Sequence, residues 1–119
     1  MIRASCHCGA VQIEVDALPK TLSQCTCSIC RRYGAVWAYR TRRTARVVSG
    51  QDAETSYSWN DKVIEFYHCN GCGCMTRYES VEKQPGSRIA VNARMISPND
   101  IAGLRVRTFD GADTWKYLD

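Results

Sequence analysis

Apolar and polar residues alternate along much of this 119-residue chain, which is the pattern of strands with one buried face. The clearest run is Val11-Gln12-Ile13-Glu14-Val15, and Leu18-Pro19 ends it. The same pattern predicts further strands at residues 35–39, 45–49, 54–59, 63–68, 76–78, 87–93 and 105–109. Many short strands separated by Gly and Asn turns indicate an all-β domain.

Helical periodicity is weak throughout. It predicts single helical turns near residues 29–33 and 98–102, and no long helix. The strands at 54–59 and 63–68 flank Asn60-Asp61, which predicts a hairpin. No repeat, low-complexity segment or linker interrupts the chain, so we expect one domain over residues 1–119.

Eight cysteines fall into three short clusters, at residues 6–8, 25–30 and 69–74. The first residues contain no apolar run like that of a signal peptide, and no stretch approaches the roughly 20 apolar residues of a membrane span. We therefore expect a cytoplasmic protein that does not enter a membrane and whose thiols stay reduced. In that setting dense cysteine indicates metal or redox chemistry, and zinc is the metal that thiolates prefer.

Two cysteine pairs have the spacing of a closed zinc site. Side chains two apart in an extended segment share a face, so Cys6 and Cys8 can bind one ion together. Cys69-x-x-Cys72, followed by Gly73, has the spacing of a zinc knuckle. Cys6, Cys8, Cys69 and Cys72 are therefore predicted to hold a structural zinc that contributes to folding; a redox or chance cluster is the alternative.

Cys25, Cys27 and Cys30 remain as a set of three, hereafter the cysteine trio. Three protein ligands with an open fourth position is the arrangement of a catalytic zinc. Three thiolates leave the ion with a net negative charge, which makes it a poor generator of hydroxide and favours thiol chemistry over hydrolysis. The alternative is a second structural zinc with Cys74 or another residue as its fourth ligand; Cys74 is otherwise read as a buried small hydrophobe or a free thiol.

The charged residues add one candidate and exclude one class of partner. Arg31 and Arg32 follow Cys30 directly, where they could offset its charge or clamp an acidic ligand. The formal net charge is +4. Seven thiolates with two zinc ions subtract three charges and leave about +1, which argues against nucleic-acid binding.

Other polar and aromatic residues are interpreted as structural. His7 and His68 are expected to be strand residues rather than bases. The arginines near the third predicted strand are expected to form a solvated face rather than an anion site; they are Arg40, Arg42, Arg43 and Arg46. The aromatic residues are expected in the core, although Trp59 or Tyr57 could line a pocket.

The cysteine order resembles a known family. Cys-His-Cys-Gly at residues 6–9, Cys-x-Cys-Ser-x-Cys-Arg-Arg at 25–32 and Cys-x-x-Cys-Gly at 69–73 are similar to the glutathione-dependent formaldehyde-activating enzymes, also called the centromere-protein-V/formaldehyde-activating family. Val91-Asn92-Ala93 and the segment 109–115 look like that family's closing segments. The chain departs from the pattern at Cys74, where Ser or Thr is expected.

The resemblance implies a fold and an activity. The fold would be a β-tent of short antiparallel strands around the structural zinc, with a second zinc on the cysteine trio at the active site. The activity would be that of a carbon–sulfur lyase that joins glutathione and formaldehyde, or a related small aldehyde, into S-hydroxymethylglutathione. We expect glutathione to place its carboxylates near Arg31 and Arg32. A non-catalytic glutathione carrier and a structural zinc-binding interaction module are the alternatives.

Overall fold

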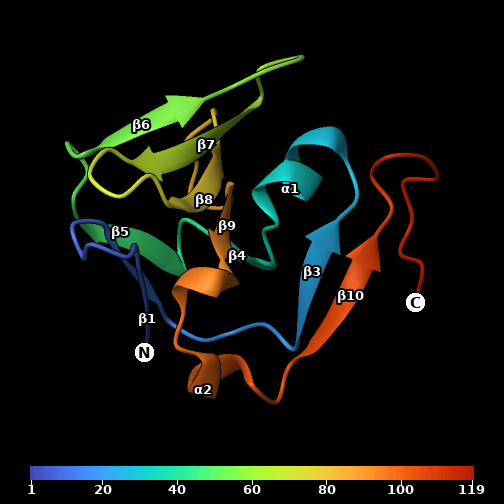
Figure 1. The fold of residues 1–119 in the computed structure, drawn as a ribbon, viewed down its shortest axis with the longest axis horizontal. Coiled ribbons are helices and arrows are strands. Elements are labelled where there is room, and N and C mark those ends of the chain that lie inside the picture. Colours follow the sequence, from blue (N-terminus) through green and yellow to red (C-terminus); the bar gives the residue numbers. More distant parts are fainter.

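Two β-sheets make up the chain, and the computed structural model describes all of it, residues 1–119 (Figure 1). The smaller sheet has the order β1-β2-β5, formed by Ile2–Ser5, Gln12–Val15 and Ala45–Ser49. The larger sheet has the order β10-β3-β4-β9-β8-β7-β6. In that order its strands are Arg105–Phe109, Thr21–Cys25, Trp37–Thr41, Arg88–Asn92, Met75–Ser80, Ile64–Cys69 and Glu54–Tyr57.

The remaining elements are short helices. They are α1 at Ser28–Tyr33, α2 at Pro98–Ile101 and the 3-10 helix η1 at Ala93–Met95. The all-β prediction is confirmed, as are the two helical turns and the hairpin between β6 and β7. None of the helices is long and apolar enough to cross a membrane.

Two strands were not predicted from the sequence, β1 and β3. β3 reads Thr-Leu-Ser-Gln-Cys, in which Leu22 is the single large apolar residue, so no alternation is visible. Its position comes from its neighbours, since it pairs in parallel with β10 along its whole length. This pairing cannot be predicted from local sequence patterns, because the aligned residues Arg105 and Thr21 lie far apart along the chain.

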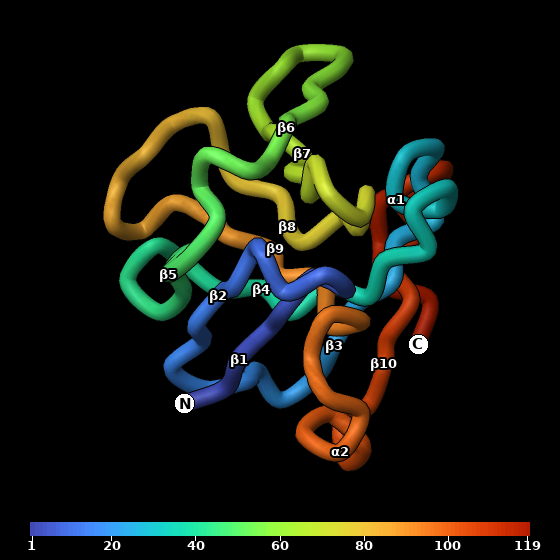
Figure 2. The backbone as a smooth tube through the Cα atoms, turned by 60° about the vertical axis from the view of Figure 1, so that its left-hand side comes forward, coloured from blue at the N-terminus to red at the C-terminus, as the bar shows by residue number.

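Side chains alternate between the two faces along the central strands of the larger sheet. Each face carries an apolar cluster of its own. On one face Ala38 and Val91 pack with the smaller sheet in a core that also holds Ile13 and Val15. Figure 2 shows β1 and β2 lying against this face. The radius of gyration, 13.5 Å, is about the value expected for one compact domain of this length. On this ground we propose that residues 1–119 form one domain.

The other face carries an aromatic cluster. Trp37 and Phe66 are fully buried there, and Tyr78 packs edge-on against Trp37 with ring centroids 4.9 Å apart. Tyr78 also meets Phe66 edge-on at 5.4 Å. The α1 helix packs against this cluster through Cys30. The aromatic face therefore lies directly beneath the cysteine trio.

A buried ion network ties β6 to β8. Both terminal nitrogens of Arg77 donate to the Glu54 carboxylate, at 2.7 and 2.8 Å, and its Nε donates to Glu79 at 2.6 Å. Arg42 also donates to Glu79, at 2.9 Å, so Arg42 contacts a buried carboxylate as well as solvent. The network keeps the sheet's outer hairpin in register.

Replacing Arg77 by alanine is expected to lower the free energy of unfolding by about 3–5 kcal/mol, because it leaves the Glu54 carboxylate buried without a cation and leaves Glu79 only its more exposed partners, Arg42 and Lys83. Urea denaturation followed by circular dichroism measures the change. Arg46→Ala is the control, since Arg46 binds Asp16 at the exposed surface and is expected to cost less than about 1 kcal/mol. Equal losses in both variants would contradict this account of the network.

Candidate functional site

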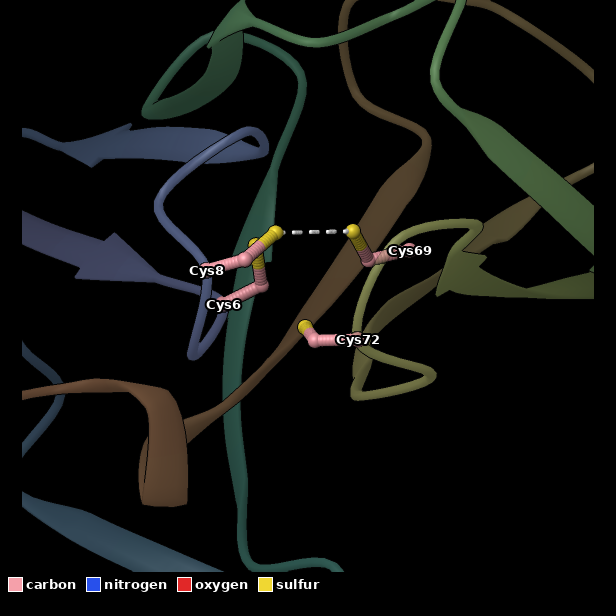
Figure 3. Close-up of side chains that lie close together, drawn as sticks. All are labelled: Cys6, Cys8, Cys69 and Cys72. Carbon is pink, nitrogen blue, oxygen red and sulfur yellow. Dashed lines mark hydrogen bonds between the residues drawn. The ribbon is translucent and has the colours of Figure 1, made fainter.

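Four cysteine sulfurs converge from two loops, as the spacing predicts. Cys6 and Cys8 follow β1, Cys69 ends β7, and Cys72 lies in the turn before β8 (Figure 3). All four sulfurs lie within 4.8 Å of one another, with Cys6 to Cys8 at 3.7 Å and Cys8 to Cys69 at 3.5 Å. A tetrahedral zinc with bonds of about 2.3 Å to sulfur holds its ligands about 3.8 Å apart. The donor set fits zinc.

Backbone N–H groups point at these sulfurs. Val11 donates to the Cys6 sulfur and Gly71 to the Cys69 sulfur, both at 3.3 Å. The N–H groups of Cys72 and Gly71 lower the pKa of Cys69, and the N–H of Cys74 lowers the pKa of Cys72 to about 5. Metal ligands must be deprotonated thiolates, so the backbone here favours the form that binds a metal.

The four-cysteine cluster lies where the two sheets meet. Cys6 and Cys69 are buried, and they pack with the fully buried Val11. The cluster thus connects the start of the chain to the β7–β8 turn, more than sixty residues later. An ion held here would stabilise the packing of one sheet on the other.

Cys74 and the two histidines lie outside both cysteine groups. The Cys74 sulfur accepts the backbone N–H of His7 and is partly buried beside the four-cysteine cluster, in agreement with its reading as a small hydrophobe or free thiol. His68 is a strand residue whose Nε2 lies 2.8 Å from the Tyr33 hydroxyl and whose Nδ1 lies 3.4 Å from the Thr55 carbonyl oxygen. His7 is exposed.

The cysteine trio forms the second group. Cys25 ends β3, Cys27 precedes the first residue of α1, and Cys30 lies within α1. The helix brings Cys27 and Cys30, three residues apart, onto one side. All three sulfurs lie within 4.8 Å of one another, and no fourth cysteine joins them.

A hydrogen bond makes two thiols of the trio differ in acidity. The Cys30 thiol interacts with the Cys25 sulfur, which lowers the pKa of Cys25 and raises that of Cys30. The backbone N–H of Cys27 also donates to the Cys25 sulfur, at 3.5 Å. The trio therefore already favours a thiolate at Cys25, as a soft metal ion requires.

The segment after β10, residues 110–119 and hereafter the C-terminal segment, is held against the trio. Figures 1 and 2 both show it beside α1. The Asp110 carboxylate accepts hydrogen bonds from the Thr26 hydroxyl at 2.8 Å and from the Thr114 N–H at 3.1 Å. The Thr26 hydroxyl also accepts the Ala112 N–H, and the Thr26 bond lowers the pKa of Asp110. Sequence reasoning missed this contact, which spans 84 residues.

Gly111 approaches the trio so closely that no larger residue fits. A Cβ at this position would lie 2.6 Å from the Cys25 sulfur and 3.2 Å from the Cys27 Cβ. The hydrogen bonds of Asp110 on one side and Ala112 on the other fix the backbone here. Gly111 is thus part of the site, although its position in the sequence gave no signal of this.

The trio opens into a cavity of about 680 Å³, whereas the four-cysteine cluster does not contribute to it. Fourteen of the eighteen lining residues are hydrophobic. The lining consists of Cys25, Cys27, Ile29, Cys30, Trp37, Tyr39, Trp59, Asn60, Asp61, Val63, Ile64, Phe66, Tyr78, Arg88, Phe109, Gly111, Trp115 and Tyr117. Trp59 lines the cavity as the sequence allowed, and Tyr57 does not.

Arg88 is the single cation of the cavity wall, and neither Arg31 nor Arg32 belongs to it. Both of those arginines are exposed on α1, and Arg32 donates to the Ser28 carbonyl oxygen at 2.8 Å. The Arg88 guanidinium lies 4.3 Å above the Tyr39 ring and makes no salt bridge. Sequence reasoning overlooked it because it stands far from every cysteine along the chain.

The comparison with known families agrees with the cysteine geometry. A family model described as glutathione-dependent formaldehyde-activating enzyme matches residues 1–109, which include all eight cysteines. The chain belongs to this family. A crystal structure of a Rhodobacter sphaeroides protein, a structural genomics target, is similar to this formaldehyde-activating family member with a TM-score of 0.72 and 31% sequence identity. The match covers 88% of this chain and 99% of that chain.

Alanine at Gly111 is expected to remove metal from the trio, because its Cβ would push Cys25 aside. The trio's affinity for zinc should fall, which mass spectrometry of the purified protein after zinc titration measures as a lower zinc content per chain. Gly103→Ala is the matched control, since a Cβ there meets no atom within 4 Å, and should keep the wild-type zinc content. An unchanged zinc content in Gly111→Ala would show that the close approach does not constrain the trio.

Proposed function

We propose that this member of the formaldehyde-activating family adds the thiol of glutathione to formaldehyde or a related small aldehyde, forming S-hydroxymethylglutathione. This is a carbon–sulfur lyase reaction written in reverse, and we place it in the reducing cytoplasm, where thiols remain free. One observation carries the proposal: three cysteine sulfurs meet at the wall of a large cavity and have no fourth cysteine beside them.

The two cysteine groups support different roles. Cys6, Cys8, Cys69 and Cys72 make up the complete ligand set of a structural zinc, and they lie between the sheets. The trio is one ligand short of such a set and faces the cavity. Zinc bound by the trio would supply a soft cation that attracts a substrate sulfur and favours its thiolate form.

The reaction requires the protein mainly to position the thiol and the aldehyde. The glutathione sulfur forms a bond to the aldehyde carbon, the carbonyl π electrons move to the oxygen, and that oxygen takes up a proton in place of the one lost by the thiol. The apolar cavity walls exclude water around the two reactants and hold them together. No histidine lines the cavity and no carboxylate joins the trio, so we assign no general base and expect water to supply the proton.

Arg88 is our candidate for binding a carboxylate of glutathione. It is a cation of the cavity wall without a carboxylate partner of its own. It also lines a second hollow of about 390 Å³, whose walls are mostly polar and include Arg40, Thr41 and Thr44. Glutathione with its sulfur at the trio and its charged ends towards Arg88 would match both surroundings. Arg31 and Arg32 remain predicted contacts for parts of the ligand outside the cavity.

The Cys27→Ala variant tests the proposed reaction. It should remain folded, lose one zinc ion per chain, and no longer accelerate exchange between hydrated formaldehyde and S-hydroxymethylglutathione, as followed by exchange NMR. Cys74→Ala is the matched control. It should retain the zinc content and the catalytic activity of the wild type, because Cys74 is outside the trio. Catalysis undiminished in Cys27→Ala would overturn the proposal. A wild-type protein that binds glutathione without exceeding the spontaneous rate would be a carrier.

The Arg88→Leu variant distinguishes the two candidate arginine sites. Losing a charged hydrogen bond to a glutathione carboxylate is expected to raise KM for glutathione about tenfold or more, with a smaller effect on kcat. Arg31→Leu and Arg32→Leu are expected to change KM by much less, since neither lines the cavity. If these two variants raised KM and Arg88→Leu did not, glutathione would lie on the outer side of α1.

A further inference from the structure

The cavity beside the trio is far larger than formaldehyde requires. Formaldehyde has two heavy atoms, and at the roughly 30 Å³ that a water molecule occupies in the liquid it needs on the order of 60 Å³. The cavity measures about 680 Å³, which lies in the range of about 300–1,000 Å³ found for drug-sized ligands. The cavity therefore has room for an aldehyde larger than formaldehyde when part of glutathione lies outside it, in the polar hollow beside Arg88.

Glutathione alone does not match the chemistry of the walls. It is a tripeptide with two carboxylates and an ammonium group, whereas eleven of the eighteen lining residues are aliphatic or aromatic, apart from the three cysteines of the trio. The polar hollow on the other side of Arg88 suits its charged ends better. Much of the apolar wall thus has no partner in glutathione, and burying apolar surface there would favour a ligand with an apolar group.

Two tryptophans from distant parts of the chain border the cavity. Trp59 lies in the β6–β7 turn and is 38% exposed, and Trp115 lies in the C-terminal segment and is 70% exposed. The buried Trp37, Phe66 and Tyr78 line the same cavity and form the aromatic cluster beneath the trio. Aromatic rings on several sides are a surface that flat, apolar groups bind well, since edge-to-face and offset contacts add to simple burial.

The backbone holds Trp115 in a conformation that a side chain seldom adopts. Its φ is +59°, in the left-handed region, where a bulky residue is strained. Its N–H donates to the Asp110 carbonyl oxygen at 2.8 Å, and its ring meets Phe109 edge-on at 5.1 Å. Backbone strain of this kind persists where surrounding contacts maintain it. Here these contacts keep the Trp115 indole exposed beside the cysteine trio.

We propose that the electrophile of this site is an aldehyde with an aromatic substituent, which lies between Trp59 and Trp115 while glutathione binds at the trio and Arg88. This inference rests on the proposed function and narrows its substrate class. Gly111, Trp115 and Tyr117 of the C-terminal segment line the cavity. The substrate preference of this chain therefore depends in part on its C-terminal segment.

The chemistry is unchanged by the larger substituent. The thiol sulfur bonds to the aldehyde carbon, the carbonyl π pair moves to oxygen, and the proton released from sulfur is balanced by the one taken up at oxygen. The product is a hemithioacetal that carries a hydroxyl and an aromatic ring on the same carbon. No electrons are gained or lost, so no oxidant or reductant is needed.

Stable thioethers of glutathione test the inference by binding alone. S-benzylglutathione has the shape of the benzaldehyde adduct without its hydroxyl, and S-methylglutathione matches the formaldehyde adduct in the same way. Isothermal titration calorimetry of the wild-type protein should show S-benzylglutathione binding about 10–100-fold more tightly, because one phenyl ring is buried against the aromatic wall. Trp59→Ala and Trp115→Ala should each reduce that preference several-fold, because they weaken the binding of S-benzylglutathione more than that of S-methylglutathione.

The control and the contrary outcomes are distinct. Tyr57→Ala removes an exposed aromatic residue of the same hairpin that does not line the cavity, so it should keep the full preference. Equal affinities for the two thioethers in the wild type would overturn the aromatic substrate and leave the proposed function standing. A preference that both tryptophan variants retain would also overturn it, since the ring would then bind elsewhere. Binding of neither thioether would overturn this inference, because the phenyl ring would gain nothing from the aromatic wall, but it would leave the proposed function to the Cys27→Ala test, since a thioether sulfur cannot form a thiolate.

Discussion

The larger sheet has to bury both of its faces, and the rest of the molecule follows from the way each face is covered. Ala38 and Val91 point to one side, where the smaller sheet closes over them completely. Trp37 and Ala90 point to the other side, where there is no second sheet. A six-residue helix and the C-terminal segment cover that aromatic face only in part, and the uncovered part is the cavity.

The two cysteine groups lie in different surroundings. The four-cysteine cluster has the four sulfurs of a closed metal site, with Cys6 and Cys69 buried where the sheets meet, so an ion held there would add stability. The trio has one ligand fewer and borders the cavity. Its position depends on hydrogen bonds between Thr26 and the C-terminal segment, which hold the backbone of Gly111 against Cys25.

The structural features that depend on local residue spacing could be predicted from the sequence. Alternation predicted the all-β class and most strands, because such patterns act over a few residues. The cysteine intervals predicted two pairs and the trio, and the four ligands of a closed zinc site joined the two pairs although they lie more than sixty residues apart. The parallel pairing of β3 with β10 and the contact of Gly111 with Cys25 escaped prediction, since each joins residues more than eighty positions apart. For the same reason the arginines next to Cys30 attracted attention, while Arg88, on a strand across the cavity, did not.

The hydrogen bonds of Asp110 have a consequence for how such a chain can change over time. They attach the C-terminal segment to the β3–α1 turn through main-chain groups and two small side chains, Thr26 and Thr114. Trp115, which is 70% exposed, can therefore be exchanged for other residues while the sulfur ligands and both cores stay as they are, whereas Tyr117 also holds the segment through its hydroxyl, 2.8 Å from that of Ser23. The recognition surface is thereby separated from the parts that fold the protein, and new substrate ranges can be explored at little cost in stability.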